Sequence, residues 1–308
     1  MLDQDTRVLA QGILTRRMLI TAIVAVLTLV AAYVGFVLTP GGQRFENAAL
    51  AGAEQADPAD RADALASLAR ISVYSLAVAV AIVFVIGLLR RRIDLAIAGV
   101  GVVAVALGVT EVLKRYLLPR PELIAHDPRI AHNSFPSGHT TIAMSVLFGL
   151  LIVVPYRWRG FALFVSVFYA VGIGEETVTA QWHRLSDTIG GDMVALLVGC
   201  LAMAFIAHRS GVTRVPRRRF SPRLIFVVLP VAIAAVGTLV LGLFLGFAGL
   251  PQNQVGTSDY DWMAYLVAQS VASGLSGLTA LVYLGLLRRV SLGSTPSEQR
   301  PEPVLADR

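Results

Sequence analysis

The sequence predicts an all-α integral membrane protein with about eight transmembrane helices. Of its 308 residues, 56% are hydrophobic and only 15% are charged, and the mean hydropathy is +0.69. A soluble domain carries about 25% charged residues. Apolar runs of about 20 residues, enough to cross the hydrocarbon core, recur along the chain. No run alternates as β-barrel strands do, and helices are the only other way to satisfy the backbone in lipid, so the runs predict helices.

Eight spans are expected in order along the chain. Arg16 and Arg17 precede the first, and no small-residue cleavage site stands out, so we interpret it as an uncleaved signal-anchor. The third and the fifth to eighth spans are rich in Gly and Ala, which suits close helix contacts in lipid. The expected spans are residues 18–39, 71–89, 93–113, 137–156, 161–181, 185–207, 224–249 and 262–287.

The segments between the spans divide the chain into five regions. Residues 1–70 hold the first span and an acidic, Ala-rich loop, which predicts an amphipathic helix pair broken at Pro58. Residues 71–207 form the expected core, and 208–223 form a basic cytoplasmic linker. Residues 224–287 hold an additional pair of spans. The tail, 288–308, has the composition of disorder.

Arginine clusters between the spans predict the orientation. With the N-terminus inside, 18 of the 26 Lys and Arg residues, among them 90–92, Arg157 and Arg159, lie in cytoplasmic segments. This matches the positive-inside rule and predicts that both termini face the cytoplasm. The net charge of +6 therefore reflects topology, and no nucleic-acid partner is expected. Cys200 is the single cysteine, so disulfides and Cys-based metal sites within the chain are excluded.

Three polar segments fall on the same predicted outer face. The first, LKRYLLPRPEL at residues 113–123, contains Lys114, the only lysine of the chain. A compact ammonium is not interchangeable with a guanidinium. Pro119 should end the preceding helix and leave Arg120 on a turn. The alternative is that Lys114 and Arg115 are interfacial residues with buried stems and hydrated charges.

The second segment is NSFPSGHTTIAM, residues 133–144. Pro136 suits a helix start, and Gly138 permits close approach to the backbone. Free N–H groups and the helix dipole at Ser137 and Gly138 favour an anion. His139, at the edge of that pocket, could hand a proton to a departing oxygen. The alternative is an ordinary helix cap with an exposed histidine.

The third segment is QWHRLSD, residues 181–187. His183 and Asp187 are four residues apart and share one helix face. Asp187 can orient His183 and leave its other ring nitrogen free to attack. The alternative is a simple ion pair at the interface. Together the segments offer cations for a phosphate, a nucleophile with its orienting carboxylate and a separate acid, a complete set for phosphomonoester cleavage.

These segments resemble the motifs K-x6-R-P, P-S-G-H and S-R-x5-H-x3-D of the type 2 phosphatidic acid phosphatases, the PAP2 superfamily, in its membrane lipid phosphatase branch. The resemblance covers roughly residues 71–207 and implies a six-helix core with an outward-facing site, the last two spans being a C-terminal addition. It implies that His183 forms a phosphohistidine assisted by Asp187, and that His139 is the acid. No metal and no cofactor are expected.

By the same resemblance, four residues would hold the phosphoryl oxygens: Lys114, Arg120, Ser137 and Gly138. Two departures stand out. Lys114 is separated from Arg120 by five residues and not six. Glu176 and Thr177 occupy the positions of the third motif's Ser-Arg, so the second phosphate-binding arginine is missing. We expect Arg184, beside His183, or Arg129, in the loop before the second segment, to compensate.

Four acidic residues at membrane depth, besides Asp187, would be costly if they faced lipid: Glu111, Glu175, Glu176 and Asp192. Glu175 and Glu176 precede the site by less than two turns, where they could pair with Arg184, Arg120 or Lys114, or stay protonated by burial. For Glu111 and Asp192 we prefer roles as hydrogen-bonding partners between helices.

The resulting expectation is a lipid-phosphate phosphatase of the cell membrane, with its site on the extracytoplasmic face. Its substrate would be a polyprenyl diphosphate such as undecaprenyl diphosphate, phosphatidic acid or phosphatidylglycerol phosphate. One alternative is a phosphotransferase that uses the same phosphohistidine. Another is a lipid-phosphate-binding or transport protein without hydrolysis, because the third-motif arginine is absent. Membrane lipids are expected partners, and a homodimer is possible.

Overall fold

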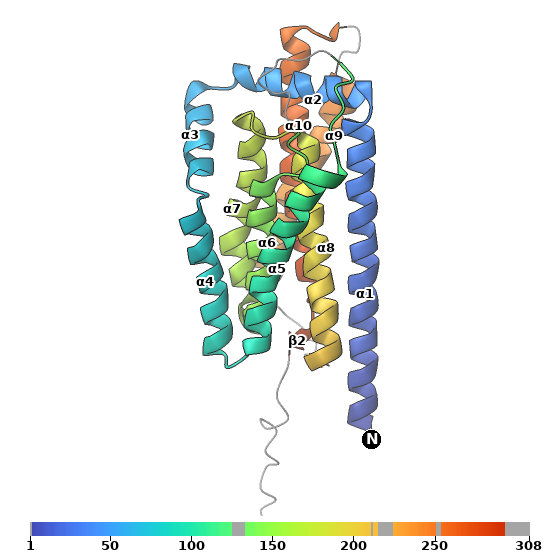
Figure 1. Ribbon diagram of the computed structural model, residues 1–308, viewed down its shortest axis with the longest axis vertical. Helices are drawn as coiled ribbons and strands as arrows, with labels where there is room; N and C mark the ends of the chain where they lie inside the picture. Colours follow the sequence, from blue (N-terminus) through green and yellow to red (C-terminus); the bar gives the residue numbers. More distant parts are fainter. Residues whose placement is uncertain (1, 125–132, 211, 215–223, 251–253, 293–308) are drawn as a thin grey trace, which may run out of the picture.

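The structure is a computed structural model, and it describes residues 2–124, 133–210, 212–214, 224–250 and 254–292. The α-helices are α1 (Leu2–Ala32), α2 (Pro40–Gly52), α3 (Pro58–Ala69), α4 (Val73–Leu89), α5 (Ile93–Val112), α6 (Gly138–Val153), α7 (Arg159–Thr179), α8 (Leu185–Ser210), α9 (Leu229–Phe244) and α10 (Ser258–Leu286). The long helices stand side by side in one bundle, and α2 lies across one end of it (Figure 1).

Short elements extend or join these helices. Four single wide π-type turns extend three of the helices: η1 (Tyr33–Val37) follows α1, η3 (Leu113–Leu117) follows α5, and η6 (Leu224–Val228) and η7 (Leu245–Gly249) flank α9. Two 3₁₀ turns are η2 (Ala53–Gln55) and η5 (Tyr156–Trp158). The strands β1 (Val212–Arg214) and β2 (Val290–Leu292) pair antiparallel at the end of the bundle opposite to α2.

The described part of the chain contains six helices long and apolar enough to cross a membrane. The chain is therefore a multi-pass membrane protein, and the predicted all-α class is confirmed. The two other expected spans differ. The span expected at 71–89 is α4, which joins α3 at a bend of 62° and makes a seventh crossing only if the pair is counted as one. The span expected at 137–156 is α6, an apolar helix of 16 residues, short of a full crossing. The count of eight and the orientation stay predictions.

The acidic loop forms the expected helix pair, with the break where it was predicted. Thr39 caps α2 and Asp57 caps α3, each by accepting a hydrogen bond from a backbone N–H, and Pro40 and Pro58 occupy the first helical positions. Proline is favoured there because the first N–H groups of a helix have no partner within it. α2 packs closely on α10, since a Cβ on Gly52 would lie 1.9 Å from the Asp261 carbonyl oxygen.

The helix α4 is attached to the bundle by only one of its halves. Its buried residues are Val83 and Gly87, both in the half remote from α3. Tyr74, at the start of the other half, is 83% exposed. The half of α4 nearest to α3 therefore leaves this side of the bundle uncovered.

At the end opposite to α2, Arg159 joins three elements. Its guanidinium donates to the carbonyl oxygens of Leu151 (2.9 Å), Leu287 (3.3 Å) and Val290 (2.6 Å). The side chain is buried. Helix ends leave carbonyl groups without partners, and a buried guanidinium can satisfy several of them, so Arg159 has a structural role besides the topology signal expected of its cluster.

Candidate active site

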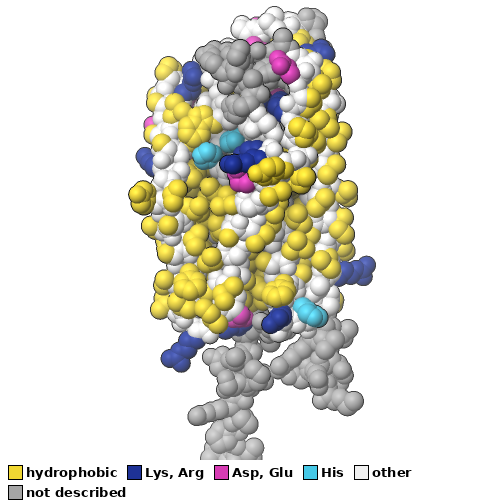
Figure 2. Space-filling model, in the orientation of Figure 1, with side chains coloured by type: hydrophobic (Ala, Val, Ile, Leu, Met, Phe, Trp, Pro, Cys, Tyr) yellow, Lys and Arg dark blue, Asp and Glu magenta, His cyan; other side chains and the backbone are white. Residues whose placement is uncertain are grey.

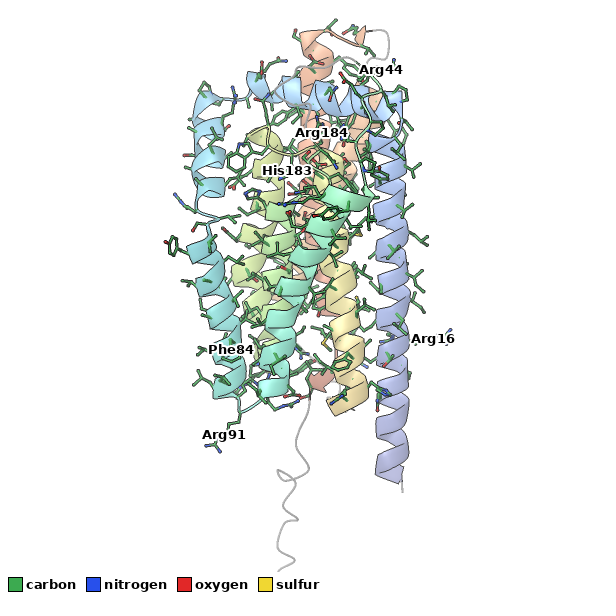
Figure 3. The ribbon with its side chains drawn as sticks, in the orientation of Figure 1. Arg16, Arg44, Phe84, Arg91, His183 and Arg184 are labelled. Atoms are coloured by element: carbon green, nitrogen blue, oxygen red, sulfur yellow. The ribbon has the colours of Figure 1, made fainter. Side chains whose placement is uncertain are left out.

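The three polar segments meet near the end of the bundle that α2 covers. Figure 3 shows His183 and Arg184 close together beneath α2, where α8 begins. Figure 2 shows histidine, basic and acidic side chains gathered in the upper half of this face, between hydrophobic side chains. The predicted convergence of the segments is thus present in the structure, and the site opens toward the side of the bundle.

The second segment forms the start of α6. Ser137 is the N-cap, and its hydroxyl oxygen accepts hydrogen bonds from the N–H (3.3 Å) and the hydroxyl (3.1 Å) of Thr140. The Ser137 N–H donates to the Asp187 carbonyl oxygen (2.8 Å). The capping alternative therefore holds for Ser137, which is fully buried. The N–H groups of Gly138 and His139 have no acceptor among the described residues, and N–H groups at a helix start favour an anion.

Lys114 brings the first segment to the same place. It lies on η3, and its Nζ atom would be 3.9 Å from a Cβ placed on Gly138. The Asn133 side-chain amide donates to the carbonyl oxygens of Lys114 (3.0 Å) and Leu118 (2.7 Å), which closes the helix end. The ammonium and the start of α6 therefore present positive charge to the same point.

Arg120 is buried beside an acidic residue that the sequence analysis missed. Its Nη2 donates to Oε2 of Glu46 at 3.0 Å, and the Nη1 atom has no partner among the described residues. Glu46, on α2, is also fully buried, and its Oε1 accepts from the Ser186 N–H at 3.0 Å. Burial raises the pKa of Glu46 and the charge of Asp187 raises it further, while Arg120 and Ser186 lower it.

The turn between α7 and α8 places His183. The Thr177 carbonyl oxygen accepts from the N–H groups of both Trp182 and His183 at 3.0 Å, which folds the chain back after α7. Nδ1 of His183 lies 3.5 Å from Oδ2 of Asp187, within ion-pair distance but without hydrogen-bond geometry. The rings of His139 and His183 have centroids 5.7 Å apart. The two histidines therefore face one site, and the Nε2 atom of His183 is the nitrogen remote from Asp187.

Asp187 is the centre of the buried polar network. Its Oδ2 accepts from the Ser134 hydroxyl at 2.5 Å and from the Arg184 N–H at 2.8 Å. Ser134 was not predicted, although it directly precedes the Phe-Pro-Ser-Gly-His run. A carboxylate held by several donors keeps its charge and its orientation, both of which an orienting partner of a histidine needs.

Thr177 stands where the resembled motif has its arginine. Its hydroxyl donates to the Gly174 carbonyl oxygen and is buried under α8. Arg184, the predicted substitute, is buried at the site, with Asp187, Arg120 and Glu46 as its charged neighbours. Its Nη1 donates to the Ser134 hydroxyl at 3.1 Å. Arg129, the second predicted substitute, lies outside the described residues.

Neither acidic residue before the site faces the basic side chains of the cluster, so the alternative in which they pair with Arg184, Arg120 or Lys114 is wrong. Glu175 accepts from the Ser273 hydroxyl of α10 at 2.9 Å. Glu176 faces Ser67 and Arg70 at the end of α3. The two side chains diverge because successive helix positions point about 100° apart.

Of the other two acidic residues, Asp192 has the predicted role and Glu111 does not. Asp192 accepts from the Ser276 hydroxyl at 2.7 Å and links α8 to α10, as predicted. Glu111 instead pairs with Arg115 at 2.7 Å, one turn along its own helix run, so the predicted link between helices is wrong for Glu111. Within the described ranges no three His, Cys, Asp or Glu side chains are grouped to hold a metal ion.

Gly191 allows α8 to approach the second segment. A Cβ there would lie 2.7 Å from the Ser137 carbonyl oxygen and 2.9 Å from Cβ of Thr140. We therefore expect Gly191→Ala to destabilise the protein by about 1–3 kcal/mol, because backbone or side chains must shift to make room. The melting temperature in detergent would measure the loss. Gly101→Ala is the matched control, since nothing lies within 4 Å of that position. Equal melting temperatures for the two variants would contradict the close approach.

Comparison with known proteins finds a family model that matches this region. Residues 94–210 match the family model described as the PAP2 superfamily. The match begins at the start of α5 and ends at the end of α8, so it contains all three polar segments and leaves out α4, which the sequence analysis included in the core. No curated protein and no solved structure matches the chain.

Proposed function

Because residues 94–210 match the PAP2 superfamily model, we propose that the chain belongs to this superfamily and is a membrane lipid-phosphate phosphatase that works through a phosphohistidine. The observation that carries the proposal is the pair of facing histidines, with the His183 ring backed by Asp187 and the start of α6 backed by Lys114. This combines a nucleophile, an orienting carboxylate, an acid and an anion site within one cluster.

The reaction takes two steps. In the first, Nε2 of His183 attacks the terminal phosphorus, the bond from that phosphorus to the leaving oxygen breaks, and protonated His139 supplies the proton to that oxygen. The leaving group is the lipid alcohol when the substrate is a lipid monophosphate, and the lipid monophosphate when it is a lipid diphosphate. In the second, water attacks the phosphohistidine, His139 takes a proton from that water, and inorganic phosphate leaves with His183 restored. Lys114, Arg120, Arg184 and the N–H groups of Gly138 and His139 would stabilise the negative charge on the phosphoryl oxygens in both steps.

The surroundings of the site favour a lipid over a soluble substrate. The polar cluster lies among hydrophobic side chains on the side of the bundle, as Figure 2 shows. The half of α4 nearest to α3 leaves that side of the bundle uncovered, and Val73 and Tyr74 in this half are exposed. A substrate whose headgroup lies at the interface and whose tail stays in the hydrocarbon layer could reach such a site without leaving the membrane.

Phosphate release by the full-length protein in detergent, with EDTA present, tests the proposal. The substrates would be undecaprenyl diphosphate, phosphatidic acid and phosphatidylglycerol phosphate, and a reaction without protein would be the blank. We expect release from at least one lipid, unchanged by EDTA, because cationic side chains and backbone N–H groups take the place of a metal ion. The preferred lipid would identify the substrate class.

Two other results would overturn parts of the proposal. Loss of release in EDTA, restored by a divalent cation, would contradict the metal-independent mechanism. Absence of release from every lipid, in protein that unfolds cooperatively, would contradict the hydrolase and favour phosphate transfer or lipid binding.

A further inference from the structure

Glu46 connects the first and third segments from outside the family match. It lies on α2, 48 residues before the matched region begins at residue 94. Its two carboxylate oxygens accept from different segments, one from Nη2 of Arg120 and the other from the Ser186 N–H, each at 3.0 Å. Ser186 directly precedes Asp187, so a single buried side chain ties Arg120 to the start of α8.

The same part of the chain holds the backbone on both sides of Arg120. The Tyr33 hydroxyl donates to the Pro119 carbonyl oxygen at 2.5 Å. Gln43, one turn before Glu46 on α2, donates to the Pro121 carbonyl oxygen at 2.7 Å and accepts from the Leu123 N–H at 3.2 Å. The turn that carries Arg120 is therefore fixed at each end by residues of the N-terminal region.

The guanidinium of Arg120 is only partly used by these contacts. Glu46 engages Nη2, while Nη1 is buried without a partner among the described residues. A buried donor without an acceptor costs free energy, and a phosphoryl oxygen would supply the acceptor. Because the guanidinium is planar and rigid, holding Nη2 also determines the direction of Nη1.

We propose that Glu46 is a positioning residue that orients Arg120 toward the phosphoryl group and aligns it with the start of α8. This inference rests on the proposed function and adds α2 to the residues on which phosphate binding depends. Neither glutamine nor aspartate could accept both hydrogen bonds, from Arg120 and from the Ser186 N–H, as glutamate does. Glutamine offers only one acceptor to two donors, and aspartate is one methylene shorter.

If Glu46 acted only through its negative charge, it would weaken phosphate binding instead of supporting it. The sign of the change in affinity after substitution therefore tests the proposal. A carboxylate near an anion site repels the anion, so neutralising Glu46 would strengthen phosphate binding, or leave it unchanged if the group is already protonated. A positioning role predicts that the affinity falls. A purely structural role predicts that the folded protein is less stable but binds as before.

The experiment measures orthovanadate affinity by titration calorimetry on the full-length protein in detergent, beside kcat and KM for the best lipid. We expect Glu46→Gln and Glu46→Asp to weaken vanadate binding about tenfold, as when a hydrogen bond to a charged group is lost. In an Arg120→Ala background we expect the same changes to alter the affinity less than about twofold, because the residue through which Glu46 acts is gone. Asp63→Asn, an exposed acid on α3, is the matched control.

The outcomes separate the two proposals. Vanadate binding by Glu46→Gln that equals or exceeds wild type would overturn the positioning role and leave the phosphatase proposal intact. An equal loss with and without Arg120 would overturn it as well, since Glu46 would then act by another route. If the wild-type protein neither binds vanadate nor releases phosphate, the proposed function fails and this inference fails with it.

Discussion

His183→Ala is expected to abolish phosphate release from every lipid substrate, by a factor of at least about 10³ in kcat. The imidazole is the only described group that is both backed by a carboxylate and within ring contact of the second histidine. Without it no covalent intermediate forms, and water would have to attack the phosphate directly. Phosphate release in detergent measures the rate, and orthovanadate binding shows whether the variant still holds an anion.

The matched control for this variant is His208→Ala. His208 is exposed near the other end of α8, and its carbonyl oxygen, which the substitution keeps, accepts from the Gln11 side chain. We expect wild-type turnover from it. Turnover by His183→Ala within about tenfold of wild type would exclude His183 as the nucleophile and with it the phosphohistidine.

Arg184→Ala is expected to lower kcat by about 10²–10³, the usual cost of removing one group that stabilises the transition state. The argument begins from Thr177, which stands where the family motif has its arginine and whose hydroxyl is used inside α7. Arg184 is the buried cation between Ser134 and Asp187, and its side chain lies near Arg120. If it substitutes for the missing arginine, Arg184→Lys should recover only part of the rate, because an ammonium cannot form the bidentate fork.

Since Arg184 is buried, its removal also has a structural cost, and two measurements separate that cost from catalysis. Thermal unfolding reports the stability of the variant, and millimolar guanidinium added to folded Arg184→Ala should restore part of kcat. Arg44→Ala is the control, because Arg44 is exposed on α2 and its side chain points away from the site in Figure 3. A folded Arg184→Ala protein with kcat within about threefold of wild type would show that the reaction proceeds without a second arginine.

Most of the helical architecture could be predicted because membrane helices are encoded locally. A run of apolar residues of spanning length is sufficient, and six of the eight expected spans correspond to helices of that kind. The two exceptions have physical reasons. α6 is only 16 residues long, since Ser137 caps one end and the chain leaves the helix before Pro155 at the other. α4 begins after a bend that hydropathy does not record.

The residues that meet in the polar cluster could be selected from the sequence, but the contacts between them could not. Four residues could be selected because each is a polar residue in a short segment next to an apolar run: Lys114, His139, His183 and Asp187. Glu46 could not be selected in this way. It lies in an acidic, Ala-rich stretch in which Glu54 and Asp63 look equivalent, and only the packing of α2 buries Glu46 and leaves the other two exposed.

The amino-acid sequence by itself determined that this protein spans a membrane, where its helices lie and which residue types meet in the cluster. These features depend on hydrophobicity, capping and helical spacing, which act over a few residues. Tertiary structure alone decided which charges face one another. It directed Glu175 toward Ser273 and Glu176 toward α3, and it buried Arg159 as a cap. It also brought Glu46 to Arg120 across 74 residues of chain. Such pairings depend on how helices rotate and pack against one another, and no local pattern in the sequence specifies that rotation.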